Sequence, residues 1–334
     1  MKEFNELSDF STIEIDELLK LARRLEERPE PRALEGKVLS LLFLNPSLRT
    51  LSSFQAAMVR LGGGTFVISP EMSIHGLESR SGIVMDGGAA EHIYEAIPVI
   101  ASYGDVIGIR AVAKIENLQN ELSDRDFKEY ISLVDKPYIN MESAINHPCQ
   151  NLADWKTLND QNISSSGGKF VLSWSWHPNA LSLAIPSSTL QMAAMRGMDV
   201  TVLRPDGYEL PDEVMNKARR VAELNGGSVN ETNDRSQAME GADVIYVNSW
   251  SSVLNYGRQS SEEKFKKELR GWCVDEPWFD TASVDCRFMH CLPIRRGVTA
   301  MDRVLDGSRS IVIQESRNRM LVQMAVLHQM LSGA

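Results

Sequence analysis

Short apolar runs alternate with amphipathic segments along the first half of the chain. Ser11-Thr-Ile-Glu14 has the pattern of a capping box and predicts a helix that continues to about Glu27. Strands are predicted over 37–44, 65–68, 105–110 and 137–141, with helices over 50–60, 90–102 and 123–133 and a polar loop over 70–82. Such an alternation of strand and helix is typical of an α/β unit built on a parallel sheet.

A second series of the same kind follows a Ser/Gly-rich stretch at 164–168. Its predicted strands are 169–174, 199–203, 243–247, 288–291 and 310–313, and its predicted helices are 187–196, 211–225 and 260–269. The segment 317–331 repeats apolar residues at helical spacing and predicts a long terminal helix. Because two series are separated by a linker, and 334 residues are many for one core, we predict two doubly wound parallel-sheet domains.

The conspicuous polar segments all follow predicted strands. They are 45–50, Arg110, 142–150, 176–177, 248–250 and 290–296. Ligands of parallel sheets bind beyond the carboxyl ends of the strands. The convergence of these segments therefore predicts a single active site between the two domains.

The segment Asn45-Pro-Ser-Leu-Arg-Thr50 lies between a predicted strand and a predicted helix. Free backbone N–H groups and the positive end of the helix dipole favour a phosphate at such a helix start. The hydroxyls of Ser47 and Thr50 add donors, and the Arg49 guanidinium can hold two phosphate oxygens at once. The pattern predicts a phosphate site, with an ordinary capped helix start as the alternative.

Charge and composition narrow the class of protein. The formal net charge is −10 and the pI is near 5.2, which argues against a nucleic-acid-binding protein, since such a protein carries a basic stripe. The four cysteines form no C-x-x-C pair, so zinc or redox spacing is absent from the sequence. There is no signal-peptide pattern and no apolar run long enough for a bilayer, so we expect a cytoplasmic protein without a membrane partner.

The sequence lacks the dinucleotide-binding, P-loop, zincin and esterase motifs. Nor do His290 and Cys291 make a nucleophile–base pair, because adjacent residues of a strand point to opposite faces. Two further arginines, Arg110 and Arg319, remain as possible anion ligands. We interpret this set as a site of hydrogen-bond donors rather than of a protein nucleophile.

His147 and Gln150 can hold a small amide-like carbonyl group, with His147 donating to its oxygen as negative charge develops. Together with the phosphate site, this pair suits direct transfer of an activated acyl group. The alternative interpretations are a turn histidine for His147 and a buried apolar cysteine for Cys291.

Three of these motifs occur together in a known family. Ser47-Leu-Arg-Thr50, His147-Pro-Cys-Gln150 and His290-Cys-Leu-Pro293 resemble the aspartate/ornithine carbamoyltransferase family, over the chain from about residue 14 to its end. Val84-Met-Asp-Gly87 and Asn140-Met-Glu142 make the chain most similar to the N-acylornithine branch. The resemblance implies a carbamoyl-phosphate domain at 1–147, an amino-acid domain at 148–312, and a C-terminal helix at 313–334 that returns to the first domain.

The resemblance also implies a set of carbamoyl-phosphate ligands. They are Ser47, Leu48, Arg49, Thr50, His75, Arg110, His147, Pro148, Cys149, Gln150, Cys291, Leu292 and Arg319. Within this set the implied catalytic residues are Arg49, Arg110, His147, Gln150 and Cys291. His147 would contact the carbamoyl oxygen, Gln150 the carbamoyl nitrogen, and the Cys291 segment both that nitrogen and the attacking amine.

The acylornithine subsite is implied in the same way. Its residues are Ala90, Glu142, His177, Asn248, Leu292 and Arg295. The family's active form is a homotrimer with sites at subunit boundaries, so the loop 70–82 would enter the neighbouring site. There the branch usually presents a tryptophan, whereas this chain has His75, for which a solvated loop residue is the alternative. The resemblance implies no cofactor and no metal.

The implied reaction moves the carbamoyl group of carbamoyl phosphate to the side-chain amine of an N2-acylated L-ornithine, in arginine biosynthesis. An amine with a pKa near 10.4 is neutral in only about one molecule in a thousand at pH 7, so the site must deprotonate it. The leaving phosphate is a suitable acceptor of that proton, so no dedicated protein base is required.

The identity of the acyl group is a separate question. The resemblance places Ala90 at the position that is glutamate in acetyl-specific and proline in succinyl-specific enzymes, so this chain lacks the negative charge that would repel a succinyl carboxylate; it places Thr299 where acetyl-specific enzymes have a lysine. Against this, Asn179 and Asn248 replace two cations that both types carry. We expect succinyl, with acetyl as the alternative. A carbamoyltransferase for another amine and a catalytically silent paralogue are the remaining hypotheses.

Overall fold

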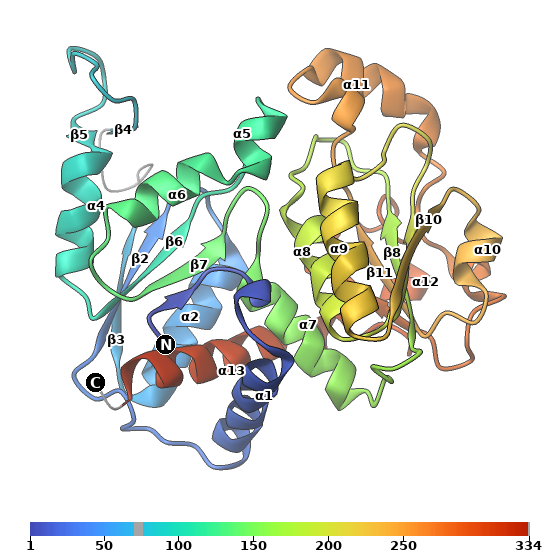
Figure 1. The fold of residues 1–334 in the computed structure, drawn as a ribbon, viewed down its shortest axis with the longest axis horizontal. Helices are drawn as coiled ribbons and strands as arrows, with labels where there is room; N and C mark the ends of the chain where they lie inside the picture. The colour runs from blue at the N-terminus through green and yellow to red at the C-terminus, as the bar shows by residue number, and fades with distance from the viewer. Residues whose placement is uncertain (70–75, 333–334) are drawn as a thin grey trace.

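Two five-stranded parallel sheets form the frame of the molecule, in a computed structural model that describes residues 1–69 and 76–332 (Figure 1). The first sheet has the order β1 (Glu3–Phe4), β7 (Tyr138–Glu142), β6 (Val106–Arg110), β2 (Val38–Phe43) and β3 (Gly64–Ile68). The second has the order β10 (Ser228–Thr232), β9 (Asp199–Leu203), β8 (Lys169–Trp174), β11 (Val244–Asn248) and β12 (Arg287–Met289). A short pair, β4 (Leu77–Glu78) and β5 (Glu91–His92), lies apart from both.

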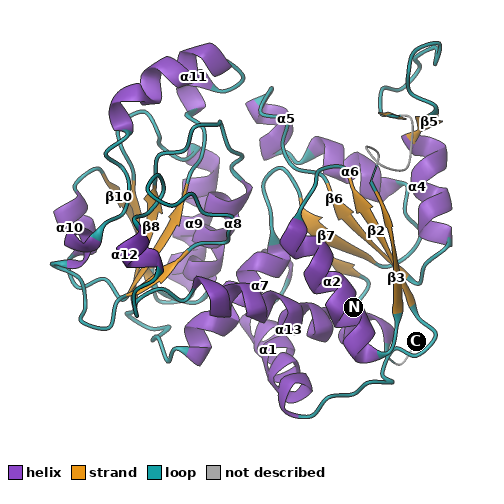
Figure 2. Cartoon of the chain, turned by 180° about the vertical axis from the view of Figure 1, so that it is seen from behind, coloured by secondary structure: helices purple, strands orange, loops and turns teal. Residues whose placement is uncertain are grey.

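Helices cover both faces of the first sheet. Side chains of β2 alternate between two apolar clusters, because successive residues of a strand point to opposite faces. One face packs against α1 (Thr12–Glu27), α2 (Leu48–Leu61), α7 (Pro148–Asp160) and α13 (Val312–Leu331). The other packs against α4 (Ile93–Ser102) and α6 (Arg125–Ser132), with α5 (Leu118–Leu122) at the side that faces the second domain (Figures 1 and 2).

The second sheet is covered in the same manner. On one face lie α8 (Ala184–Met195) and α9 (Asp212–Leu224), and on the other α10 (Arg235–Met239) and α12 (Asp302–Leu305). At the end nearest α5 lies α11 (Gln259–Phe265) (Figure 2). Both sheets are therefore doubly wound, as the sequence predicts.

The terminal helix α13 packs against α1, α2 and α7, so the chain returns to its first domain as predicted. The predicted boundary at residue 147 falls on the N-cap of α7, a helix that contacts both α13 and α8. The division at 147 and 312 stays a prediction, since α7 belongs to the packing of both halves.

The structure differs from the prediction in particular elements. The strand expected over 310–313 is wrong, because Ser310 makes only an isolated bridge to Phe288 and α13 begins at Val312. The fifth strand is instead β10, whose residues Ser-Val-Asn-Glu-Thr are too polar to stand out in the sequence. The helix expected over 123–133 is present as α6, and the short helix α5 before it is not predicted; Asp124, between the two, is in the left-handed region at φ 54°.

Polar contacts connect the two domains at their edges. Lys217 of α9 forms an ion pair of 3.0 Å with Glu6, and the Tyr256 hydroxyl donates to the Glu121 carboxylate. Among residues 1–69 and 76–332, no helix is both long and apolar enough to cross a membrane.

Candidate active site

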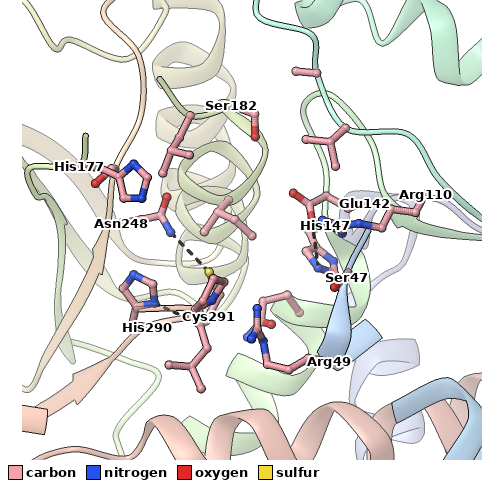
Figure 3. Close-up of a pocket in the computed structure, with 18 of the residues that line it drawn as sticks. Ser47, Arg49, Arg110, Glu142, His147, His177, Ser182, Asn248, His290 and Cys291 are labelled. Carbon is pink, nitrogen blue, oxygen red and sulfur yellow. Dashed lines mark hydrogen bonds and ion pairs between the residues drawn. The ribbon is translucent and has the colours of Figure 1, made fainter. Parts of the chain in front are cut away.

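A cavity of about 360 Å³ lies between the domains, at the carboxyl ends of both sheets. Figure 3 shows Ser47, Glu142 and His147 on one wall and Asn248, His290 and Cys291 on the other, with Arg49 between them. The predicted site residues that line it are Ser47, Arg49, Arg110, Glu142, His147, Gln150, His177, Asn248, Cys291, Leu292 and Arg319. The structure thus brings the three sequence motifs into one pocket.

Ser47 begins α2 and turns the helix start toward the cavity. Its side chain accepts a hydrogen bond of 3.3 Å from the Thr50 amide and donates to the Thr50 hydroxyl over 3.0 Å. Thr50 itself is buried beneath the cavity and accepts a 2.7 Å hydrogen bond from Arg319. The Leu48 side chain is 76% exposed and does not line the pocket. Its backbone N–H, at the first position of α2, is one of the free donors of a helix start.

Three guanidinium groups surround the helix start. The Nε atoms of Arg49, Arg110 and Arg319 are buried and have no hydrogen-bond partner among the described residues. Burial lowers the pKa of Arg49 and Arg319, but a guanidinium remains charged at physiological pH. Unpaired donors and positive charge at a helix N-terminus make a binding site for an anion with several oxygens.

His147 is a neutral imidazole. It is buried, and burial together with the positive charges of Arg319, Arg110 and Arg49 holds its pKa well below the ordinary value. Its Nε2 lies 3.5 Å from a Glu142 carboxylate oxygen that also accepts from Arg110. A neutral ring can donate one hydrogen bond to a carbonyl oxygen and cannot serve as a strong acid.

The rest of the His147 motif divides between helix and cavity. Pro148 occupies the first turn of α7, and Cys149 is fully buried in the core, where burial raises its pKa to about 12. Neither lines the pocket. Gln150 does, and its Nε2 donates to Asp154 over 2.7 Å and to Glu315 over 2.9 Å.

Cys291 lies on the second-domain wall as a thiol. Burial raises its pKa, with a further increase from the Glu315 and Glu142 carboxylates, and the Asn248 amide donates to its sulfur over 3.4 Å. The next residue, Leu292, has φ 55°, and its amide donates to His290 Nδ1 over 2.9 Å. An un-ionised thiol held in this way suits contact with a polar group rather than nucleophilic attack.

His290 is a site residue that the sequence interpretation missed. It lines the cavity, and burial lowers its pKa to about 3. Because Nδ1 accepts from Leu292, the ring hydrogen of the neutral form is on Nε2, so the ring both orders the turn and offers a donor. The signal in the sequence is the position of His290 at the head of its motif, at the end of a predicted strand.

The residues expected to bind acylornithine are only partly brought together within one chain. His177 lines the pocket and accepts a 3.0 Å hydrogen bond at Nε2 from Arg295, which lies exposed at its rim. Burial lowers the pKa of His177, which is therefore neutral. Ala90 is exposed and outside the pocket, in the segment before β5 that projects away from the second domain (Figure 1). His75 lies outside the described residues.

Comparison with known proteins identifies a family for the chain. Two family models match: the carbamoyl-P binding domain of aspartate/ornithine carbamoyltransferase over residues 2–160, and its Asp/Orn binding domain over 184–330. An N-acetylornithine carbamoyltransferase of Xanthomonas campestris is 36% identical over 98% of this chain and 97% of its own length. An N-succinylornithine carbamoyltransferase of Bacteroides thetaiotaomicron is 32% identical over 89% of this chain and 88% of its own.

A solved structure shows the same fold. The crystal structure of acetylornithine transcarbamylase complexed with acetylcitrulline has a TM-score of 0.94 and 35% sequence identity. The match covers 99% of both chains.

Proposed function

The chain belongs to the aspartate/ornithine carbamoyltransferase family, and on that premise we propose that it carbamoylates the side-chain amine of an N2-acylated L-ornithine. Carbamoyl phosphate is the donor, and the products are an N-acyl-L-citrulline and phosphate. The observation that carries the proposal is the shared cavity, in which the anion site at Arg49 and Arg319 adjoins His147 and Cys291. Because the anion ligands and the carbonyl ligands share one cavity, they can bind the two ends of one molecule of carbamoyl phosphate, a mixed anhydride.

The donor fits the cavity in one direction. Its phosphate takes the start of α2 with the donors of Arg49, Arg110 and Arg319, because charge and unpaired N–H groups are concentrated there. Its carbamoyl oxygen takes the hydrogen bond from neutral His147, which stabilises the charge that develops on that oxygen. Its nitrogen then faces the free Gln150 oxygen and the Cys291 turn.

The reaction needs no protein base. The amine nitrogen forms a bond to the carbamoyl carbon, the carbon–oxygen bond to phosphate breaks, and its electron pair leaves with the phosphate. The histidines that line the cavity have lowered pKa values, Cys291 has a raised one, and Glu142 is paired with Arg110. The departing phosphate is therefore the acceptor of the ammonium proton. Holding both reactants in one cavity supplies about 7 kcal/mol or more of barrier reduction.

The proposed acyl group is succinyl. In the cavity Thr299 is neutral and buried, and the carboxylate that lines the pocket, Glu142, is paired with Arg110. Arg295, at the rim beside His177, offers a cation to a second carboxylate. These features leave the one free carboxylate of a succinyl chain unopposed by negative charge.

Acetyl is the second candidate. Ser182, Asn248 and Thr299 make a neutral polar wall, which suits an uncharged acyl group. Steady-state rates with N-succinyl- and N-acetyl-L-ornithine decide between them. We expect kcat/KM to be several-fold higher for the succinyl substrate, and a several-fold preference for acetyl would reverse the order.

The central test is formation of acylcitrulline from carbamoyl phosphate and either acylornithine. A phosphonoacetyl derivative of ornithine, which joins both reactants in one molecule, should raise the melting temperature of the protein by several degrees. If the protein carbamoylates putrescine or another amine and accepts neither acylornithine, it is a carbamoyltransferase with a different amine substrate. Absence of turnover and of thermal protection would indicate a silent paralogue.

The proposed assembly is a homotrimer with shared sites. Exposed apolar residues collect on α4 and the segment beside it, namely Val84, Met85, Tyr94, Val99 and Tyr103. Such a collection on a protein surface marks an association site. In a trimer the projecting segment that carries Ala90 reaches a neighbouring cavity. Light scattering should give about three times the 37.3 kDa mass of one chain.

A further inference from the structure

Two carboxyl groups hold the Gln150 amide beneath the cavity. Gln150 is 1% exposed, and its nitrogen donates to Asp154 Oδ1 over 2.7 Å and to Glu315 Oε1 over 2.9 Å. Its oxygen is buried and has no hydrogen-bond partner within the described part of the chain. Both hydrogens of the amide nitrogen are therefore used, whereas the oxygen is available to a ligand.

The two carboxyls fix which end of the amide faces the cavity. If the amide were inverted, its oxygen would lie within 3 Å of two carboxyl oxygens, and its nitrogen would lose both acceptors. That arrangement costs buried hydrogen bonds and adds repulsion between like partial charges. Asp154 and Glu315 thus select one of the two orientations of Gln150.

The same pair reaches the second-domain wall. The other oxygen of Glu315 accepts a 3.0 Å hydrogen bond from the backbone N–H of His290, immediately before Cys291. One carboxyl group of α13 consequently contacts both Gln150 of α7 and the turn after β12. The pair sets the position of two motifs relative to each other.

Burial acts on both carboxyls of the pair. Burial, together with the charge of the partner carboxyl, raises the pKa of Glu315, and burial raises that of Asp154. The other groups that face the pair are Arg319, the Tyr246 hydroxyl and the Cys291 thiol. Adjacent buried carboxyls oppose each other's ionisation, so the position of the pair rests on its hydrogen bonds to Gln150 and His290.

We propose that Asp154 and Glu315 are a positioning pair that directs the Gln150 oxygen at the donor's N–H group, and thereby excludes acyl phosphates that lack this group. The inference rests on the proposed function, because it concerns how that site recognises carbamoyl phosphate. Acetyl phosphate is the matched probe, since a methyl group replaces the NH2 at nearly the same volume. When acetyl phosphate is bound, the buried Gln150 oxygen has no N–H group from which to accept a hydrogen bond.

The experiment compares the KM of carbamoyl phosphate with the Ki of acetyl phosphate and of inorganic phosphate as competitors. In the wild-type protein we expect acetyl phosphate to bind at least tenfold more weakly than carbamoyl phosphate. Asp154→Asn supplies an N–H donor to the oxygen of an inverted Gln150. The ratio of the acetyl phosphate Ki to the carbamoyl phosphate KM should therefore fall at least fivefold. The Ki of inorganic phosphate should stay within twofold. Glu315→Gln removes one acceptor of the Gln150 nitrogen and should lower the ratio in the same direction.

Thr157→Val is the control. Thr157 accepts a 2.9 Å hydrogen bond from Asn318, so its loss breaks a buried contact between the same two helices without touching Gln150. The control should melt at a lower temperature and keep the wild-type ratio. If Asp154→Asn does not fold, Glu315→Gln and the wild-type ratio still decide.

The outcomes separate cleanly. A parallel loss of affinity for all three phosphates in the variants would show that the pair is merely structural. A wild-type ratio near one would also overturn the inference. Failure of the wild-type protein to use carbamoyl phosphate would instead reject the proposed function.

Discussion

Arg49 is the residue on which the anion site depends most. It lies between the two walls of the cavity and contributes a buried, unpaired Nε donor. We expect Arg49→Ala to lower kcat/KM about 10³-fold, the range found when a donor to developing charge is removed. Arg303→Ala, which removes an exposed arginine paired with Glu276, is the control and should leave the rate unchanged. Retained activity in Arg49→Ala would remove the proposed mechanism.

The neutral state of His290 predicts a pH dependence of stability. The unfolded chain binds a proton at this residue below about pH 6.5, whereas the folded chain holds the pKa near 3. The stability contributed by neutral His290 is therefore complete above pH 6.5 and is lost as the pH falls below it. His290→Asn keeps an acceptor for the Leu292 amide but does not titrate.

Urea unfolding at pH 7 and pH 5 checks this prediction. We expect the free energy of unfolding to decrease by about 2 kcal/mol more in the wild-type protein than in His290→Asn. His147 titrates in the same direction in both proteins and cancels from the comparison. Equal decreases in the free energy of unfolding of the two proteins would mean that folding does not lower the pKa of His290.

At the residue scale, sequence patterns predicted the side chains that lie in short motifs after strands. They did not predict Asp154 and Glu315, which position those side chains. Asp154 lies four residues after Gln150, and Glu315 four before Arg319, so helical spacing alone places each on the face of a named residue. Their meeting, and their contact with His290, requires α13 to return across the first domain. No local pattern contains that information.

At the scale of elements, α13 connects the phosphate site to the core. Arg319 reaches from α13 to Thr50 of α2 over 2.7 Å, and the two helices pack along their lengths. Thr50→Val should raise the KM of carbamoyl phosphate about tenfold and lower stability by about 1–3 kcal/mol, because it leaves a buried guanidinium donor unpaired. Ser53→Ala, on the same helix, removes a hydroxyl that donates to the Thr50 backbone oxygen and leaves the Thr50 hydroxyl in place, so it is the control for both measurements.

The prediction of helices and strands was correct where the pattern of apolar residues was strong, and it was wrong where that pattern was weak. Buried strands such as β2 and β8 are mostly apolar runs, which the sequence displays directly. The edge strand β10 is polar, and the apolar 310–313 stretch is the start of a buried helix, which periodicity cannot distinguish from a strand. Only the pairing of neighbouring strands resolves these two cases.

At the scale of the whole molecule, Ala90 lies outside the cavity of its own chain, on a segment that projects from the first domain. If acyl selection belongs to this residue, it must act on the cavity of a neighbouring chain, which the proposed trimer would bring within its reach. Ala90→Glu places a negative charge there and should shift the preference about tenfold from the succinyl to the acetyl substrate, since two carboxylates then oppose each other.

A mixture of two chains locates that effect. One chain is wild type, and the other carries both Arg49→Ala, which inactivates its own cavity, and Ala90→Glu. In mixed trimers the active cavities belong to wild-type chains, yet those beside a variant neighbour receive its glutamate. We expect their succinyl-to-acetyl ratio of kcat/KM to fall as the variant fraction rises. A ratio that stays at the wild-type value would show that Ala90 acts within its own chain or not at all.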